Sequence, residues 1–233
     1  MKRIILPLCV SLLILPAIAN ARINKPVSFI ELRTKNNELQ SHQYSCGATS
    51  LASLLTIFGK PTSEEELINE IFPTKRISRV NQELLEVEPL SLKDLEDLSR
   101  NRGLKVVSLQ ALDEKSAYNA LTDLAPIITR IRVHDDVLHF VLVKSVANGW
   151  VYIGDPGYGN IHLPWNQFYP AFNEGKRIFL SISTEPFMAK VNLKDKTISI
   201  KRVDKRDPDE VADNIPKQLI DAARKTIRFN NSF

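Results

Sequence analysis

The stretch that decides the fold is QSHQYSCGATSLASLLTIFG, residues 40–59, with Cys46 near its middle. Its large apolar side chains recur at i, i+3, i+4 and i+7, the spacing of one helical face. That face consists of Leu51, Leu54, Leu55 and Phe58. The pattern predicts a helix over residues 46–58, with Ser45 as its N-cap and Gly59 at its end.

Cys46 is the only cysteine expected in the mature chain. Residues 1–21, MKRIILPLCVSLLILPAIANA, combine two basic residues, an uncharged apolar run and a final Ala-Asn-Ala. This pattern predicts a secretory signal peptide that contains Cys9 and is cleaved after Ala21. In an exported protein an unpaired thiol is either reactive or a small buried hydrophobe, and the cysteine count alone leaves both readings open.

The composition indicates a globular chain with a true core, because 43% of the residues are hydrophobic. The net charge of +4 falls to +2 when Lys2 and Arg3 are removed, which is too little to indicate nucleic-acid binding. Beyond residues 1–21 the sequence shows no run apolar enough to span a bilayer. It also contains no GxxxxGK[ST] phosphate-binding motif.

Helical patterns precede strand patterns along the chain. TSEEELINEIF predicts a second helix capped by Thr62 or Ser63, and SLKDLEDLSRNRG predicts a third with Ser91 as its cap and Gly103 at its end. After Gly103 five segments follow with the period of strands: LKVVSL, PIITRIRV, HFVLVKSV, WVYIGD and RIFLSIS. DEKSAYNALTDL predicts a helix between the first two, and LPWNQFYPAF a helical turn before the last. This order predicts an α+β fold, a helical layer packed on a mostly antiparallel sheet.

The domain boundaries follow from changes in composition. Residues 22–39 form a lead-in in which PVSFIEL is a candidate strand, and residues 40–183 form the main domain. Residues 184–233 form a C-terminal appendage, with a hairpin expected at AKVNLKDKTISIKRV and a helix at DEVADNIPKQLIDAARKTI. Residues 72–90 fit no regular pattern and are expected to form a loop that contacts ligand.

A thiol in the first turn of a helix differs chemically from one in a core. The free N–H groups and the helix dipole favour the thiolate form of Cys46, which still needs a base and a donor for the oxyanion that forms. The chain offers four histidines: His42, His134, His139 and His162. His139 opens an apolar strand, where a structural role is the more common one. The next strand, however, ends in Asp155, so a base and its orienting carboxylate can lie on adjacent strands.

The register of the hairpin HFVLVKSVANGWVYIGDP decides whether these two side chains meet. A two-residue Asn148-Gly149 loop places Asp155 and His139 on opposite faces. A three-residue loop that begins at Ala147 places them on one face, roughly 7–8 Å apart at Cα, and Gly149 suits its third, left-handed position. A catalytic pair therefore requires this odd register, or a bulge that restores it.

Three segments, QSHQYSCGATSLASLL, HFVLVKSV and YIGDPGYGNIHLPWNQF, lie in this order between Gln40 and Ser183. Together they resemble the bacteriocin-processing peptidases that remove double-glycine leader peptides. Cys-Gly at a helix start is a weak signal alone, but with His-Phe-Val-x-Val and a following Asp-Pro-x-x-Gly it becomes fairly specific. The resemblance implies a papain-like cysteine peptidase fold, in which a helix carries the nucleophile and the sheet carries its partners.

The resemblance also assigns roles to individual residues. It implies that Cys46 is the nucleophile, His139 the general base and acid, and Asp155 the residue that orients the imidazole. The family's oxyanion glutamine lies six residues before the cysteine, which is Gln40 here, with Gln43 as the fallback. It implies no cofactor and no metal ion.

One departure from the family concerns location. Most members form the cytoplasmic front of an exporter, whereas this sequence carries a predicted signal peptide and neither membrane nor ATPase domains. It is more similar to a stand-alone exported branch that includes the peptidase of functional-amyloid secretion systems in Gram-negative bacteria. This implies a periplasmic peptidase whose partners are an exported or amyloid-forming substrate, with a Gly-Gly or Gly-Ala cut, and a component of the secretion apparatus. Two alternatives stay open: a catalytically silent module that binds an unfolded or leader segment, and another thiol transfer such as deamidation.

Overall fold

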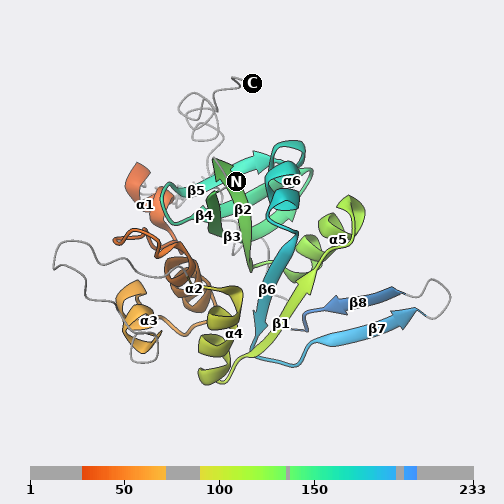
Figure 1. Cartoon of the computed structure of the whole chain (residues 1–233), viewed down its shortest axis with the longest axis horizontal. Coiled ribbons are helices and arrows are strands. Elements are labelled where there is room, and N and C mark those ends of the chain that lie inside the picture. Colours follow the sequence, from red (N-terminus) through yellow and green to blue (C-terminus); the bar gives the residue numbers. More distant parts are fainter. Residues whose placement is uncertain (1–27, 72–89, 135–136, 193–196, 204–233) are drawn as a thin grey trace, which may run out of the picture.

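The computed structural model describes residues 28–71, 90–134, 137–192 and 197–203. Four helices come first: α1 (Phe29–Thr34), α2 (Cys46–Ile57), α3 (Glu64–Ile71) and α4 (Leu92–Asn101). Strands follow, with α5 (Glu114–Leu124) and α6 (Trp165–Glu174) placed between them. In Figure 1, α1 to α4 gather on one side of the sheet, and α5 and α6 lie on the other. The α+β layout predicted from the sequence is confirmed.

Six strands form the main sheet in the order β1-β6-β2-β3-β4-β5, and every neighbouring pair is antiparallel. The strands are β1 (Lys105–Gln110), β2 (Ile127–His134), β3 (Val137–Ala147), β4 (Trp150–Asp155), β5 (Gly159–Pro164) and β6 (Ile178–Ser183). β3 is therefore a central strand. All five predicted strands are confirmed, within one or two residues at their ends.

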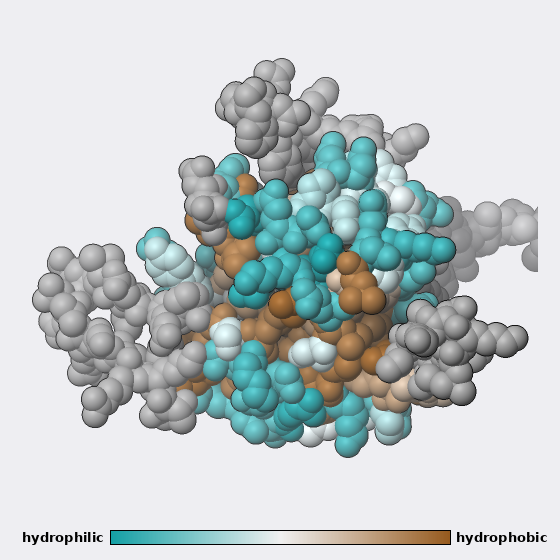
Figure 2. All heavy atoms as spheres, turned by 45° about the vertical axis from the view of Figure 1, so that its right-hand side comes forward, coloured by the Kyte–Doolittle hydropathy of each residue, from teal (hydrophilic) through white to brown (hydrophobic). Residues whose placement is uncertain are grey.

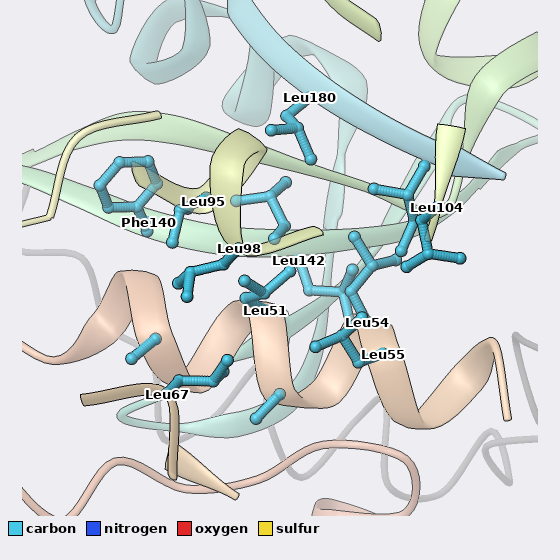
Figure 3. Close-up of a cluster of buried hydrophobic side chains, with 14 of the residues drawn as sticks. Leu51, Leu54, Leu55, Leu67, Leu95, Leu98, Leu104, Phe140, Leu142 and Leu180 are labelled. Atoms are coloured by element: carbon cyan, nitrogen blue, oxygen red, sulfur yellow. The ribbon is translucent and has the colours of Figure 1, made fainter. Parts of the chain in front are cut away.

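The sheet separates two hydrophobic cores. Phe140 and Leu142 of β3 pack with α2 and α4 on one face, as the close-up in Figure 3 shows. Val141 and Val143, which alternate with them, pack with α5 and α6 on the other face. A strand covered on both sides needs an apolar residue at nearly every position, and this explains the continuous apolar run that begins at His139.

Helix α2 is buried on almost every side rather than on one face. Leu51, Leu54 and Leu55 have no exposed surface, and neither do the small residues Ala48 and Ala52 of the same helix. Figure 3 shows the leucines directed at the sheet and at α4. Truncating one such leucine to alanine costs about 2–5 kcal/mol of unfolding free energy, because a cavity adds to the lost burial. This packing fixes the position of the residue at the start of α2.

The predicted helices α3 and α4 begin with capping boxes, as α5 does with Asp113 and Ser116. The Glu66 N–H donates to Ser63 Oγ and the Ser63 N–H donates to the Glu66 carboxylate, both at 3.1 Å, so Ser63 rather than Thr62 is the cap of α3. Ser91 and Asp94 form the equivalent reciprocal pair at the start of α4. The sequence prediction for both helices is confirmed, because a capping box is a local feature.

The two ends of α2 differ from each other. At the C-terminal end Gly59 has φ +70°, and the Lys60 N–H donates to the Leu55 carbonyl at 2.9 Å, which completes the predicted glycine stop. At the N-terminal end the prediction is wrong in part. Ser45 occupies the N-cap position, but its side chain makes no capping hydrogen bond and instead donates to the His42 carbonyl at 2.6 Å.

Three other expectations need correction. The candidate strand in PVSFIEL is helical over Phe29–Thr34, because Ser28 Oγ accepts the Glu31 N–H and caps a short helix there. The sequence did not predict β5, whose first residues follow directly on the turn after β4. The expected turn at LPWNQFYPAF is a full ten-residue helix, α6, with Pro170 inside it.

The β3–β4 hairpin has a two-residue turn and a bulge. Ala147 pairs with Trp150, and Asn148 and Gly149 between them have φ of 52° and 77°, as a primed turn requires. Of the two alternatives left open by the sequence, the three-residue loop is therefore absent and the compensating bulge is present. The register then shifts at Lys144, an extra residue that places Leu142 opposite Gly154. The bulge restores the register that brings His139 and Asp155 to one face.

The described part of the C-terminal appendage is the predicted hairpin, β7 (Met188–Asn192) and β8 (Thr197–Lys201). It is joined to the main domain through Arg202, which is buried. The guanidinium Nη2 donates to the Leu124 carbonyl at 2.7 Å, the Pro126 carbonyl at 2.9 Å and Ser181 Oγ at 2.8 Å. Such charge-assisted hydrogen bonds are stronger than neutral ones, so Arg202 ties the end of β8 to the main domain.

Some sequence predictions lie outside the described residues. These are the signal peptide at 1–21, most of the segment 72–90 and the helix expected after residue 204. In the parts of the chain that the structure describes, no helix is long and apolar enough to cross a bilayer. Hydrophobic side chains do reach the surface, and Figure 2 shows them gathered in a band below a mostly hydrophilic region.

Candidate active site

Cys46 is the first residue of α2 and carries a free, partly buried thiol. Gly47 lets this first turn lie against the sheet, since a Cβ there would stand 3.3 Å from the Phe140 ring. Ser50, one turn further on, donates to the Phe140 carbonyl at 3.3 Å. Both contacts fix the start of α2 against β3 beside His139, the residue that precedes Phe140.

His139 and Asp155 form a hydrogen-bonded pair across the hairpin. The Nε2 atom of His139 lies 3.2 Å from Oδ2 of Asp155. The other oxygen of this carboxylate, Oδ1, accepts the N–H groups of Gly157 at 2.7 Å and Tyr158 at 3.0 Å. Asp155 is 4% exposed, so its carboxylate is held in one orientation by the turn that follows β4.

The electrostatics of the site favour a charged histidine. Burial opposes the imidazolium, but hydrogen bonds to Asp155 and Cys46, together with their charges, raise the pKa of His139 from 6.5 to about 9. Burial likewise opposes ionisation of Asp155, yet its pKa stays below the ordinary value because His139 and the N–H groups of Tyr158 and Gly157 stabilise the carboxylate. The three side chains therefore interact as one unit.

Gln40 lies next to this unit through its backbone. Its N–H donates to the Pro156 carbonyl at 2.9 Å, directly after Asp155 in sequence. Its side-chain Nε2 donates to the His42 carbonyl at 3.3 Å, and its buried Oε1 accepts no hydrogen bond from any described residue. Gln43, the fallback, is exposed. Of the two candidate amides, Gln40 is the one that is partly buried and joined to the turn after Asp155.

Sequence reasoning missed residues of the lead-in that hold the Asp155 turn. Asn37 is buried, and its Nδ2 donates to the Asp155 carbonyl at 3.1 Å. The guanidinium of Arg33 donates to the carbonyls of Tyr158 and Gly157. These partners lie more than 115 residues apart in sequence, and only the position of Asn37 just before Gln40 could have hinted at its role.

The other three histidines have different surroundings. His162 of β5 packs against the rings of Trp150 and Tyr152, while His42 and His134 are exposed. Among the residues with described positions, no three His, Cys, Asp or Glu side chains gather as metal ligands would. The arrangement of thiol, imidazole and carboxylate suits nucleophilic catalysis at a carbonyl carbon.

Comparison with known proteins agrees with this chemistry. Residues 34–185 match the peptidase C39 family. The chain belongs to this family of cysteine peptidases. Membership agrees with the papain-like fold class expected from the sequence, because the structure has a helix that begins with Cys46 near the start of the domain and an antiparallel sheet behind it.

Two curated relatives come from pseudomonads. "Probable functional amyloid protease FapD" of Pseudomonas fluorescens is 28% identical over 151 residues, which cover 64% of this chain and 62% of the relative. The protein of the same name from Pseudomonas aeruginosa is 24% identical over 135 residues, 58% of this chain and 55% of the relative. The chain thus matches less than two thirds of the length of either.

Solved structures of peptidase domains are also similar. One is a double-glycine-motif protease from an AMS/PCAT transporter, in complex with its leader peptide. It has 21% identity and a TM-score of 0.48, and it covers 62% of this chain and 87% of its own. Another is the peptidase domain of Streptococcus ComA, with 16% identity and a TM-score of 0.49, covering 64% of this chain and 98% of its own.

Proposed function

We propose that this chain is a periplasmic cysteine endopeptidase that cleaves an exported protein through Cys46, His139 and Asp155. The observation that carries the proposal is the coupled unit itself: His139 bonded to a buried carboxylate at 3.2 Å and to the thiol at the start of α2. Membership in the peptidase C39 family supports the same reaction class.

In the first half of the reaction, the Cys46 sulfur attacks the carbonyl carbon of the scissile peptide bond. Since Nε2 of His139 is bonded to Asp155, Nδ1 is the ring nitrogen left to face the thiol. The thiol proton passes to His139, the S–C bond forms, His139 gives that proton to the amide nitrogen, and the C–N bond breaks. The amine product leaves and a thioester to Cys46 remains.

In the second half, water replaces the amine. His139, now neutral, accepts a proton from water as its oxygen attacks the thioester carbon, and the C–S bond breaks to release the carboxylic acid. In both halves negative charge develops on the carbonyl oxygen. The Cys46 N–H at the start of α2 and the Gln40 amide are the donors proposed for this oxyanion.

The proposed substrate is an exported or amyloid-forming protein cut after Gly-Gly or Gly-Ala. The family resemblance supports the small residues at the cut, and the named activity of the pseudomonad relatives supports an amyloid-system substrate. The signal-peptide pattern of residues 1–21 supports a periplasmic location. A component of the secretion apparatus is the further partner proposed.

Alkylation of Cys46 separates an enzyme from a silent binding module. Iodoacetamide should label the thiol rapidly near neutral pH in the full chain, and His139→Ala should slow this labelling strongly, because the imidazolium stabilises the thiolate. Slow labelling that is indifferent to His139→Ala contradicts the proposal and favours the module.

Two experiments, one with a peptide library and one in cells, would identify the substrate. An internally quenched library with Gly-Gly or Gly-Ala at its centre should be cut by the wild type and not by Cys46→Ala, and fragment masses give the bond. Comparing the secreted proteins of cells that carry wild type or Cys46→Ala should show a precursor that accumulates in the variant. Glutamine or asparagine converted without chain cleavage would indicate deamidation instead.

A further inference from the structure

Three consecutive glutamates begin α3, and one of them behaves differently from the others. Glu65 and Glu66 are exposed, as expected in the first turn of a helix, whereas Glu64 is 3% exposed. A buried carboxylate is costly unless hydrogen bonds compensate it. The side chain of Glu64 must therefore have partners inside the protein.

Those partners all belong to the loop that leads into Cys46. Oε2 of Glu64 accepts the Ser41 N–H at 2.9 Å and the Ser41 hydroxyl at 2.7 Å, and Oε1 accepts the His42 N–H at 3.3 Å. The Ser45 hydroxyl also interacts with this carboxylate. One side chain thus holds the loop from its second residue to the residue before the thiol.

The carboxylate remains charged in this position. Burial opposes ionisation, but the hydrogen bonds from Ser45, Ser41 and His42 outweigh it and keep the pKa of Glu64 below its ordinary value. Glu38, the other acidic group at this position, is directed at the backbone of α3, where its Oε1 accepts the Glu64 N–H at 3.1 Å. A neutral side chain could not accept all of the loop's donors.

The held loop also carries the proposed oxyanion donor. Gln40 opens it, and the His42 carbonyl accepts both the Gln40 amide at 3.3 Å and the Ser45 hydroxyl at 2.6 Å. Tyr44 within the loop has φ +69°, a conformation that a non-glycine residue adopts only when its surroundings impose it. The Gln40 amide is therefore bonded within a loop whose backbone is strained at Tyr44 and depends on outside contacts to keep its shape.

We propose that Glu64 is a positioning residue, which holds the Gln40–Ser45 loop so that the Gln40 amide and the Cys46 N–H converge on one oxyanion. It does not touch the reacting atoms and acts through Gln40. This inference rests on the proposed peptidase function. Ser45 does not cap α2 with its side chain, since its hydroxyl donates to the His42 carbonyl within this loop.

The test compares Glu64→Gln with Glu65→Gln, a matched change at the exposed neighbour, using the best-cleaved peptide of the library above. Glu64→Gln should lower kcat by about 10- to 100-fold with KM changed by less than about 3-fold, because misplacement of a donor affects the transition state. Glu65→Gln should match the wild type. Iodoacetamide labelling of Cys46, which needs no oxyanion donor, should stay within about 2-fold in both.

A double-mutant cycle with Gln40→Ala decides whether Glu64 acts through Gln40. In the Gln40→Ala background, Glu64→Gln should cost little more, since residues that act as a unit are not additive. If Glu64→Gln does not fold, Ser41→Ala removes one donor to the same carboxylate and should lower kcat by about 3-fold, again only when Gln40 is present.

Two kinds of failure are distinguishable. If the wild type turns over and Glu64→Gln behaves like Glu65→Gln, or if the two losses are additive in the cycle, this inference is wrong and the peptidase function stands. If the wild type cuts no peptide and Cys46 labelling is indifferent to His139→Ala, the proposed function fails and this inference fails with it.

Discussion

The two ends of α2 differ: the C-terminal end is closed by a glycine stop, and the N-terminal end lacks a side-chain cap. Its C-terminal end is apolar and closes with Gly59 at φ +70°, as local sequence chemistry predicts. Its N-terminal end carries Cys46, and there the predicted cap fails because the Ser45 hydroxyl is bonded to the His42 carbonyl. Natural sequences break local rules mainly at functional sites. The comparison teaches that one end of the helix supplies stability and the other supplies chemistry.

The largest effect should come from Cys46→Ala at the chemical end. Loss of the nucleophile should lower kcat by at least about 10⁴-fold. The change removes a single sulfur from a partly buried site, so the melting temperature should change little. Turnover assays measure the loss of kcat, and thermal unfolding measures the melting temperature. Activity that persists in Cys46→Ala would mean that another group is the nucleophile.

Gln40→Ala should have the next largest effect. Removing one oxyanion donor costs about 10²–10³-fold in kcat, and KM should change much less. Gln43→Ala, at the exposed alternative, is the matched control and should retain the wild-type rate. If Gln43→Ala lowers kcat and Gln40→Ala does not, the two amides have been assigned in the wrong order.

At the C-terminal end of α2, Leu54→Ala should have the opposite effect: it should lower stability and leave kcat unchanged. Leu54 has no exposed surface, so its truncation should lower the free energy of unfolding by about 2–5 kcal/mol. The kcat per folded molecule should remain that of the wild type, as measured by active-site titration below the melting transition. A large loss of kcat with unchanged stability would erase the distinction between the two ends.

The smallest effect is a pH dependence at the chemical end. The folded-state pKa of His139, about 9, lies above its ordinary 6.5. The contribution of the His139 imidazolium to the free energy of unfolding is therefore complete below pH 6.5, and it disappears as the pH rises through 9. Urea unfolding of wild type and His139→Ala across this range should show the difference between the two shrinking. A difference that grows with pH would contradict the shift.

Local signals in the sequence were enough to predict much of this molecule. Periodicity and caps predict α2, α3 and α4, since each signal lies within the element it describes. For the site, the sequence shows which reactive residue types are present and in which order, but not how their side chains meet in space. The Lys144 bulge that brings His139 and Asp155 together has no such signature, because it depends on pairing across the finished sheet.

The remaining misses have the same physical origin. Asn37 and Glu64 stand next to ordinary polar residues in the sequence, and only the folded chain shows that each is buried against the site. The wrong strand in the lead-in also fits this explanation, since six residues carry too little periodicity to separate a short helix from a strand. Contacts over long sequence distances supply what local reasoning lacks.

The central claim is that Cys46, His139 and Asp155 act as one coupled unit. An NMR titration of the His139 imidazole in the full chain, repeated with Asp155→Asn, tests it most directly. We expect a pKa of about 9 for His139 in the wild type, and a fall toward 6.5 in Asp155→Asn, because the variant loses the carboxylate that stabilises the imidazolium. A wild-type pKa near 6.5 that Asp155→Asn leaves unchanged would show that the three side chains are not coupled.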